Sequence, residues 1–181
     1  MTIFNKIDSL FFNIAKASIF LCMFLITFNA AGRYIFHKPI TGAYEFTELY
    51  LMVTMVFLSL SYTWQMRGFI AINIFSNKFS MPLKNIVYIL ILFSGISFFG
   101  LIGYEASIGT FDAYMNDQRA SGIIQWPISL STIWIPIGCL MIVLRMIIEF
   151  IIGLKKLSID GIKADLFNQI EKDNDLDIEN N

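Results

Sequence analysis

The chain has 181 residues, of which 56% are hydrophobic and 15% charged, whereas an ordinary soluble domain has about 25% charged residues. Its formal net charge of −1 provides no broad basic field, so the composition excludes a nucleic-acid-binding protein, which needs clustered Lys and Arg. A hydrophobic excess of this size, with 18 Phe, is typical of a bundle of membrane-spanning helices.

Four long stretches without charged residues lie along the chain, at 17–32, 49–66, 85–104 and 120–144. A charge at the centre of a bilayer costs about 2.5 to 3.5 kcal/mol, so uncharged stretches mark the segments that can cross it. A crossing helix needs roughly 20 residues. We therefore predict an all-α membrane protein whose membrane domain, residues 1–157, is a bundle of four transmembrane helices near 10–32, 45–65, 85–107 and 130–153.

The first predicted span contains Lys16 about one turn inside its start, where a long side chain can extend its ammonium group to the interface. Its basic start, apolar centre and small residues at 30–32 are also found in signal peptides. We interpret the segment as retained, because the apolar stretch is long for a signal peptide and three more spans follow. Within its predicted bounds, residues 10–32, the first span has no Asp or Glu.

Three segments outside the spans have patterns of their own. The loop at 68–82 alternates apolar and polar residues, which favours a segment lying on the membrane surface. The loop at 105–125 is acidic and is predicted to form a partly helical cap. Residues 158–181 combine an apolar stripe at helical spacing with an acidic end, which predicts a short cytoplasmic amphipathic helix and a solvated tail from 173.

The basic residues near the span ends predict the orientation, because Lys and Arg gather on the cytoplasmic side. Eight lie at the amino terminus, in the second loop and after the fourth span, against three in the first and third loops: Arg33, Lys38 and Arg119. Both termini are therefore predicted to be cytoplasmic. Trp64 and Trp126 lie beside predicted span ends, where indoles favour the headgroup level.

Haem, thiol and metal chemistry each need residues that the predicted spans lack. His37 is the only histidine and lies in a loop, whereas a four-helix membrane cytochrome needs axial ligands. Cys22 and Cys139 lie in separate apolar stretches and form no redox pair. Clustered metal ligands and a phosphate-binding Gly-rich loop are also missing from the sequence. We predict no cofactor and no enzymatic activity.

The charged residues near the span ends are candidates for function by default. Glu45 and Glu48 are one turn apart at the start of the second span and are predicted to share a face. They fit a favourable charge at a helix amino terminus as well as they fit a partner contact. Arg145 and Glu149, spaced i to i+4, are predicted to form an ion pair within the fourth span.

Two further features concern packing. Gly95, Gly100 and Gly103 give the third span a surface of small residues that allows another helix to approach closely. Pro136 falls inside the fourth span, where it is predicted to bend the helix or leave a carbonyl unpaired.

A set of motifs resembles the DctQ family, the small membrane subunit of tripartite ATP-independent periplasmic (TRAP) transporters. It consists of Arg33-Tyr-Ile-Phe-His-Lys-Pro39, Glu45 at the start of the second span, Arg67 before the surface segment, and the later pairs Trp126-Pro127 and Pro136-Ile137.

The resemblance implies a non-catalytic subunit in the bacterial inner membrane that scaffolds a large multispanning transport subunit. In that family, a periplasmic substrate-binding protein delivers an organic acid, and an ion gradient, usually sodium, drives its uptake. The substrate and ion sites belong to the large subunit. The matching positions Arg33, Pro39, Glu45 and Arg67 are carried over as candidate residues for assembly or for positioning in the lipid bilayer.

A different function is a small channel or exporter whose pore forms between identical four-helix copies. Small multidrug exporters keep an acidic residue within the first span, and the predicted first span has none. A membrane enzyme with a partner's cofactor is the third alternative, and the ligand count argues against it.

Overall fold

The computed structural model describes residues 2–66 and 81–160 and is helical throughout these ranges, apart from turns and one isolated bridge between Arg119 and Pro127. Four helical segments are long and apolar enough to cross a membrane. They are Phe4–Ile35, Ala43–Gln65, Leu83–Met115 and Ile128–Lys155. The prediction of an all-α protein with four such segments is confirmed.

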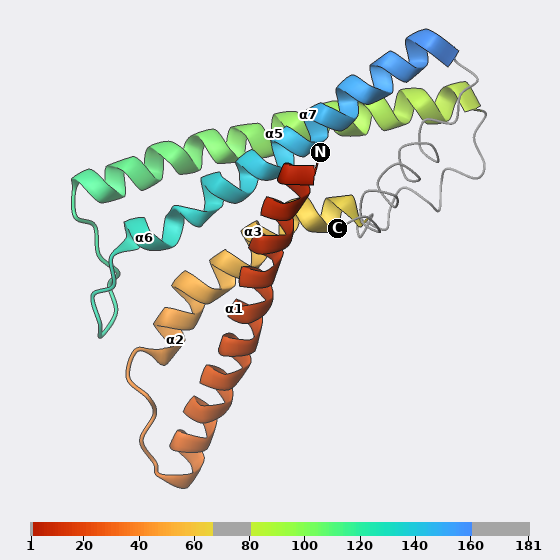
Figure 1. Ribbon diagram of the computed structural model, residues 1–181. Helices are drawn as coiled ribbons and strands as arrows, with labels where there is room; N and C mark the ends of the chain where they lie inside the picture. The colour runs from red at the N-terminus through yellow and green to blue at the C-terminus, as the bar shows by residue number, and fades with distance from the viewer. Residues whose placement is uncertain (1, 67–80, 161–181) are drawn as a thin grey trace.

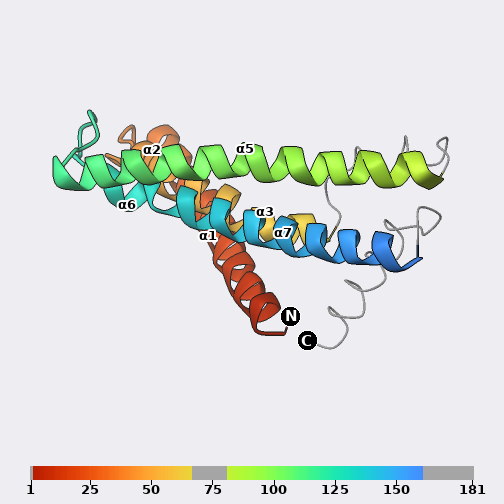
Figure 2. The ribbon, with the colours of Figure 1, turned by 90° about the horizontal axis from the view of Figure 1, so that it is seen from above.

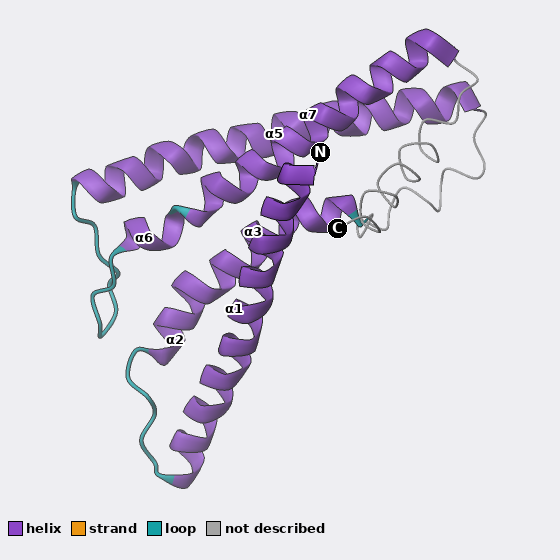
Figure 3. Ribbon diagram, in the orientation of Figure 1, coloured by secondary structure: helices purple, strands orange, loops and turns teal. Residues whose placement is uncertain are grey.

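The first and third of these segments are single helices, α1 (Thr2–Ile35) and α5 (Met81–Met115). The second consists of α2 (Ala43–Phe46), the π-helix η1 (Thr47–Met52) and α3 (Val53–Gln65). The fourth consists of α6 (Ile128–Thr132) and α7 (Trp134–Asp160). Figure 3 shows the helices in purple and the connecting loops in teal.

The helices pack in the order α1, α3, α7 and α5, because the closest pairs are α5 with α7, α1 with α3, and α3 with α7. Figures 1 and 2 show α5 and α7 side by side, with α1 oblique to them. Successive segments run in opposite directions. The amino-terminal ends of α1 and α5 and the carboxyl-terminal ends of α3 and α7 therefore lie toward the same end of the bundle, which we call the terminal end; the loops at 36–42 and 116–127 form the loop end.

The third loop is shorter than predicted. Its predicted start at Glu105 is wrong, because α5 continues to Met115. Glu105 and Asp112 are exposed on that helix. They are seven residues apart, which is about two helical turns, and therefore project from one helical face. Because this face is exposed, α5 can continue past both carboxylates without burying them in the core.

The fourth segment is interrupted where Pro136 was predicted to distort it. The helix breaks at Ile133, between α6 and α7 (Figure 3). Pro136 has no N–H to donate to the carbonyl of Thr132, four residues earlier. The side chain of Thr132 connects α6 to α5, because its hydroxyl accepts a hydrogen bond from Thr110, with 3.1 Å between the oxygens.

The bundle core lies toward the terminal end and is formed by Trp64, Tyr88, Leu92, Ile142 and Met146. Trp64 lies at the end of α3, beside the predicted span end, but its side chain packs inside the bundle, where only 6% of the residue is exposed. Its ring fills space between three helices, and its N–H has a buried acceptor, as described below.

Small residues bring the helices together at two contacts. A Cβ at Gly138 on α7 would overlap the backbone carbonyl of Phe57 on α3, so these helices cross at a distance that only glycine permits. A Cβ at Gly95 on α5 would lie 2.8 Å from the Met146 sulfur on α7. Part of the small-residue surface predicted on the third span is thus used within the chain, against α7.

Two predicted elements lie largely outside the described residues. The first is the surface segment at 68–82, of which only Met81 and Pro82 are described; they form the start of α5. The second is the cytoplasmic segment at 158–181, of which only residues 158–160 are described; they form the end of α7.

Candidate assembly site

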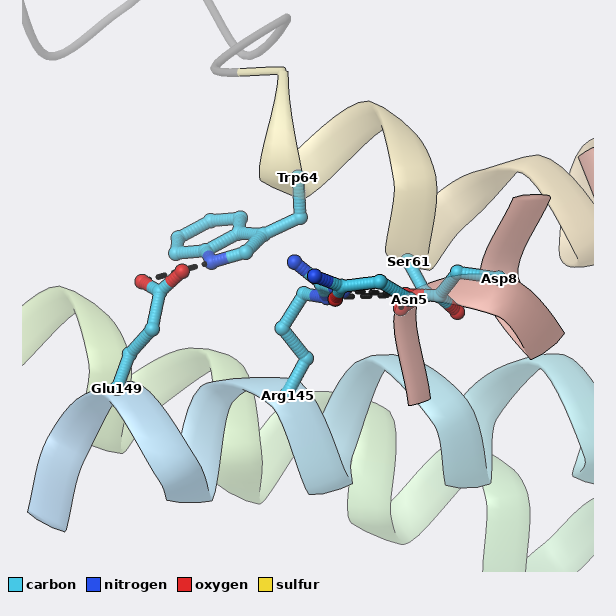
Figure 4. Close-up of polar contacts among 6 residues, drawn as sticks. All are labelled: Asn5, Asp8, Ser61, Trp64, Arg145 and Glu149. Carbon is cyan, nitrogen blue, oxygen red and sulfur yellow. Dashed lines mark hydrogen bonds and ion pairs between the residues drawn. The ribbon is translucent and has the colours of Figure 1, made fainter. Parts of the chain in front are cut away.

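A layer of buried polar side chains joins the helices near the terminal end of the bundle. All four long helices contribute to it, and each member is less than 8% exposed. Figure 4 shows six of the residues lying between α1, α3 and α7. We call this set the buried polar layer; it consists of Asn5, Asp8, Ser61, Trp64, Tyr88, Arg145 and Glu149.

One half of the buried polar layer is centred on the carboxylate of Asp8. Its Oδ2 atom accepts hydrogen bonds from Arg145 Nη2 at 2.6 Å and from Arg145 Nε at 3.0 Å. The hydroxyl of Ser61 donates to the same oxygen at 3.0 Å. Arg145 Nη2 also donates to Asn5 Oδ1 at 2.9 Å. Asp8 is 1% exposed and Arg145 4%, so the two opposite charges neutralise each other inside the bundle.

The other half of the layer is centred on Glu149, one turn along α7. Its Oε2 atom accepts hydrogen bonds from Trp64 Nε1 on α3, at 3.1 Å, and from Tyr88 Oη on α5, at 2.8 Å. Hydrogen bonds to an ionised acceptor are stronger than those between neutral groups. Glu149 therefore connects α7 to both neighbouring helices.

The predicted ion pair between Arg145 and Glu149 is wrong. The guanidinium of Arg145 extends toward α1 and binds Asp8, whereas Glu149 is turned toward α3 and α5. On an exposed helix, residues four apart interact with each other because they have only water as an alternative. On this buried face, the three other long helices offer better partners.

Asp8 is the functional residue that sequence reasoning missed. The predicted first span began at residue 10, whereas α1 begins at Thr2 and its membrane-compatible part begins at Phe4. The statement that the first span has no acid is therefore wrong. The antiparallel order of the helices explains the site, because it brings the first turns of α1 beside the middle of α7.

A second group of contacts fixes the loop end. The carboxylate of Glu45, in the first turn of α2, accepts hydrogen bonds from the backbone N–H of Ile123 at 3.0 Å and of Ile124 at 3.4 Å. A Cβ at Gly122 would overlap this carboxylate. The left-handed φ of 78° at Gly42 favours glycine just before α2. Glu45 thus holds the 116–127 loop against the second segment.

Side chains around η1 strengthen this contact. Tyr50 Oη donates to the carbonyl of Pro127 at 2.7 Å, and Ser131 Oγ donates to the carbonyl of Leu49. Phe46, Tyr50 and Trp126 form an aromatic group with ring centroids 5.3 to 5.9 Å apart. Trp126 Nε1 is buried without a hydrogen-bond acceptor among the described residues.

The four candidate residues taken from the family motifs do not form one site. Glu45 is partly buried and bound to the chain's own loop. Arg33 and Pro39 are exposed at the end of α1 and in the turn after it, with the Arg33 guanidinium 5.3 Å from the ring centroid of Tyr34. No hydrogen bond or ion pair joins any two of these three residues. Arg67 lies outside the described residues.

Chemically, both groups of contacts connect helices and loops. Their charged members bind other parts of the same chain, and no group of three or more His, Cys, Asp or Glu that could hold a metal ion occurs within 2–66 and 81–160. What the arrangement can do is fix four helices and one loop in a single geometry.

Comparison with known proteins gives one match. Residues 22–156 match the family model described as "Tripartite ATP-independent periplasmic transporters, DctQ component". Comparisons with curated proteins and with solved structures gave no match. The matched residues begin within α1, after Asp8, and end in α7, so they include most of the helical bundle. The chain therefore belongs to the DctQ family, the small membrane component of TRAP transporters.

Proposed function

We propose that the chain is the non-catalytic small subunit that scaffolds the large transport subunit of a TRAP-type secondary transporter. In this proposal the complex takes up an organic acid, driven by an ion gradient, after a periplasmic binding protein has delivered the substrate. The chain lies in the inner membrane with both termini in the cytoplasm. Family membership supports the assignment to a small TRAP component.

The observation that carries the scaffold role is the ion pair between Asp8 and Arg145 inside the buried polar layer. A scaffold must keep its shape while the transport domain beside it moves. Removing one partner of a buried ion pair costs about 3 to 5 kcal/mol, because the other charge stays buried and unpaired. Sliding α1 along α7 would separate Asp8 from Arg145, so the layer opposes movement within the bundle.

The distribution of basic residues supports the proposed orientation. Lys84 and Lys155 belong to the terminal end of the bundle, whereas Arg33, Lys38 and Arg119 belong to the loop end. The sequence places further Lys and Arg next to the terminal end. Since basic residues favour the cytoplasmic side, the terminal end is proposed to face the cytoplasm.

The four carried-over residues receive separate proposed roles. Glu45 organises the periplasmic loop at 116–127, to which it is hydrogen-bonded. Arg33 and Pro39, both exposed at the loop end, position the chain at the membrane surface or against the large subunit. Arg67, outside the described residues, is proposed to act in assembly or in positioning the chain in the membrane.

The self-assembling exporter is not favoured, although the first helix does contain an acid. In an exporter that acid would have to be free to bind protons or substrate. Asp8 is instead 1% exposed and hydrogen-bonded to Arg145 and Ser61. Its carboxylate thus connects helices of the bundle and is not free to bind protons or substrate.

Affinity purification tests the proposal. The chain is co-expressed with the large subunit encoded beside it, and a tag on the small chain is used to purify both from mild detergent. We expect the large subunit to co-purify in equal amount. Recovery of the small chain only as a complex with itself, with the large subunit in the flow-through, would contradict the proposal.

A further inference from the structure

A cavity of about 330 Å³ lies between α1 and the start of the second segment. Its walls are mainly apolar and include Leu25 and Ile26 on α1 and Met52 on η1. Polar side chains also line it: Asn29 from α1, Tyr44 from α2, and Thr47 and Glu48 from η1. The Thr47 hydroxyl donates to the carbonyl of Ala43 at 2.8 Å. The cavity is on the outer side of the packing order, since α1 is the last helix of the series and packs along its length mainly against the second segment.

Glu48 is placed differently from Glu45, although the two are three residues apart. Glu45 lies in the last α-helical turn before η1 and binds the 116–127 loop, whereas Glu48 lies inside η1 and lines the cavity beside α1. The wider π-helical turn changes the angular spacing of successive side chains. The prediction that both carboxylates share one face is therefore wrong.

The carboxylate of Glu48 has no hydrogen bond or ion pair with any described residue. It lies about 7 Å along the helix axis from Ala43, at 1.5 Å per residue, and so below the start of the membrane-compatible segment. A charge among apolar side chains at this depth is costly unless it is paired. Asn29 makes no hydrogen bond with it; its Oδ1 accepts the backbone N–H of Ile40 at 2.9 Å, which holds the turn after α1.

We propose that this cavity receives a Lys or Arg side chain from a membrane helix of the large transport subunit, with Glu48 as its ionic partner. Charge complementarity selects a cation, and the apolar walls match the aliphatic part of a Lys or Arg side chain. A lipid ammonium group stays at the headgroup level, whereas a basic side chain on a neighbouring helix reaches the carboxylate inside the bilayer. This inference rests on the proposed function, because it needs the large subunit as partner.

The test measures how much large subunit remains bound to the tagged small chain during washing in mild detergent. We expect Glu48→Gln to lower the retained fraction about tenfold and Glu48→Lys to abolish retention, because loss of one partner leaves the other charge buried. The isolated variants are expected to unfold at the wild-type temperature, since Glu48 makes no hydrogen bond or ion pair with the described residues. Wild-type retention in both variants would overturn the proposal.

Glu105→Gln is the matched control, because Glu105 is also an exposed carboxylate on a membrane helix but does not line this cavity. It is expected to retain the large subunit as the wild type does; an equal loss in this variant would overturn the assignment to Glu48. Reduced phosphatidylethanolamine in purified Glu48→Gln, with unchanged large subunit, would show a lipid site and would also overturn it. If the wild type itself fails to bind the large subunit, the proposed function fails, and not this inference alone.

Discussion

The carboxylate of Asp8 on α1 accepts two hydrogen bonds from the guanidinium of Arg145 on α7, at 2.6 and 3.0 Å, across a sequence separation of 137 residues. This contact connects two helices that are not adjacent in the packing order, since α3 lies between them for most of their length. Ser61 on α3 donates to the same carboxylate. Three helices thus meet at one oxygen atom, which makes this contact the centre of the buried polar layer.

Asp8→Ala is expected to destabilise the isolated chain by about 3 to 5 kcal/mol, because it leaves the Arg145 guanidinium buried without its counterion. The measurement is thermal or denaturant unfolding in detergent. The double variant Asp8→Leu with Arg145→Met removes both charges and is expected to recover most of the loss, since an apolar pair of similar volume often replaces a buried ion pair without cost. Equal instability of the single and double variants would show that packing, and not the unpaired charge, is responsible.

Trp64→Phe is expected to cost about 1.5 to 3 kcal/mol, because it removes an N–H that donates to the Glu149 carboxylate. Trp134→Phe is the matched control: Trp134 is partly buried but makes no hydrogen bond through its indole with the described residues. Unfolding midpoints of the two variants should therefore differ. If both fell equally, the loss would reflect ring size alone.

Gly122→Ala is expected to loosen the 116–127 loop, because the added Cβ would overlap the Glu45 carboxylate and displace it from the amides of Ile123 and Ile124. Hydrogen exchange at those two amides should become faster, while exchange within α7 stays unchanged. Glu45→Gln retains one acceptor oxygen and should accelerate exchange less. Protected amides in Gly122→Ala would contradict the proposed role of Glu45 in holding this loop.

Gly138→Ala is expected to destabilise the bundle by about 1 to 3 kcal/mol, because a Cβ there would overlap the backbone of Phe57 and force α3 and α7 apart. Gly100→Ala is the control, since a Cβ at that helical position has no atom within 4 Å. It should be neutral or stabilise the helix by up to about 1 kcal/mol. A similar loss of stability in both variants would show that the close crossing of α3 and α7 is not the cause of the loss in Gly138→Ala.

The four membrane segments could be predicted from the sequence, because the cost of a charge in lipid leaves long uncharged stretches wherever a helix crosses. Their ends could not be placed in this way. Asp8 near the start of α1 and Glu105 in α5 lie within helices that continue past the charge, because one carboxylate is paired inside the bundle and the other is exposed.

The buried polar layer was missed because its partners come from distant parts of the sequence. A signal for it does exist in α1, where the buried residues Asn5, Asp8, Ala15 and Ser18 follow a helical spacing. Large apolar residues such as Phe20 and Phe24 are exposed on the same helix. In a membrane, the small and polar face of a helix marks its protein contact. Looking for polar stripes rather than apolar ones would have identified Asp8.

The most direct test of the scaffold role is substrate uptake by reconstituted vesicles that contain the small chain alone, the large subunit alone, or both, with the periplasmic binding protein and an ion gradient supplied in each case. The account predicts uptake only when both membrane subunits are present, with uptake falling in proportion to lost assembly in the Asp8→Ala variant. Gradient-driven uptake by the small chain alone would contradict it.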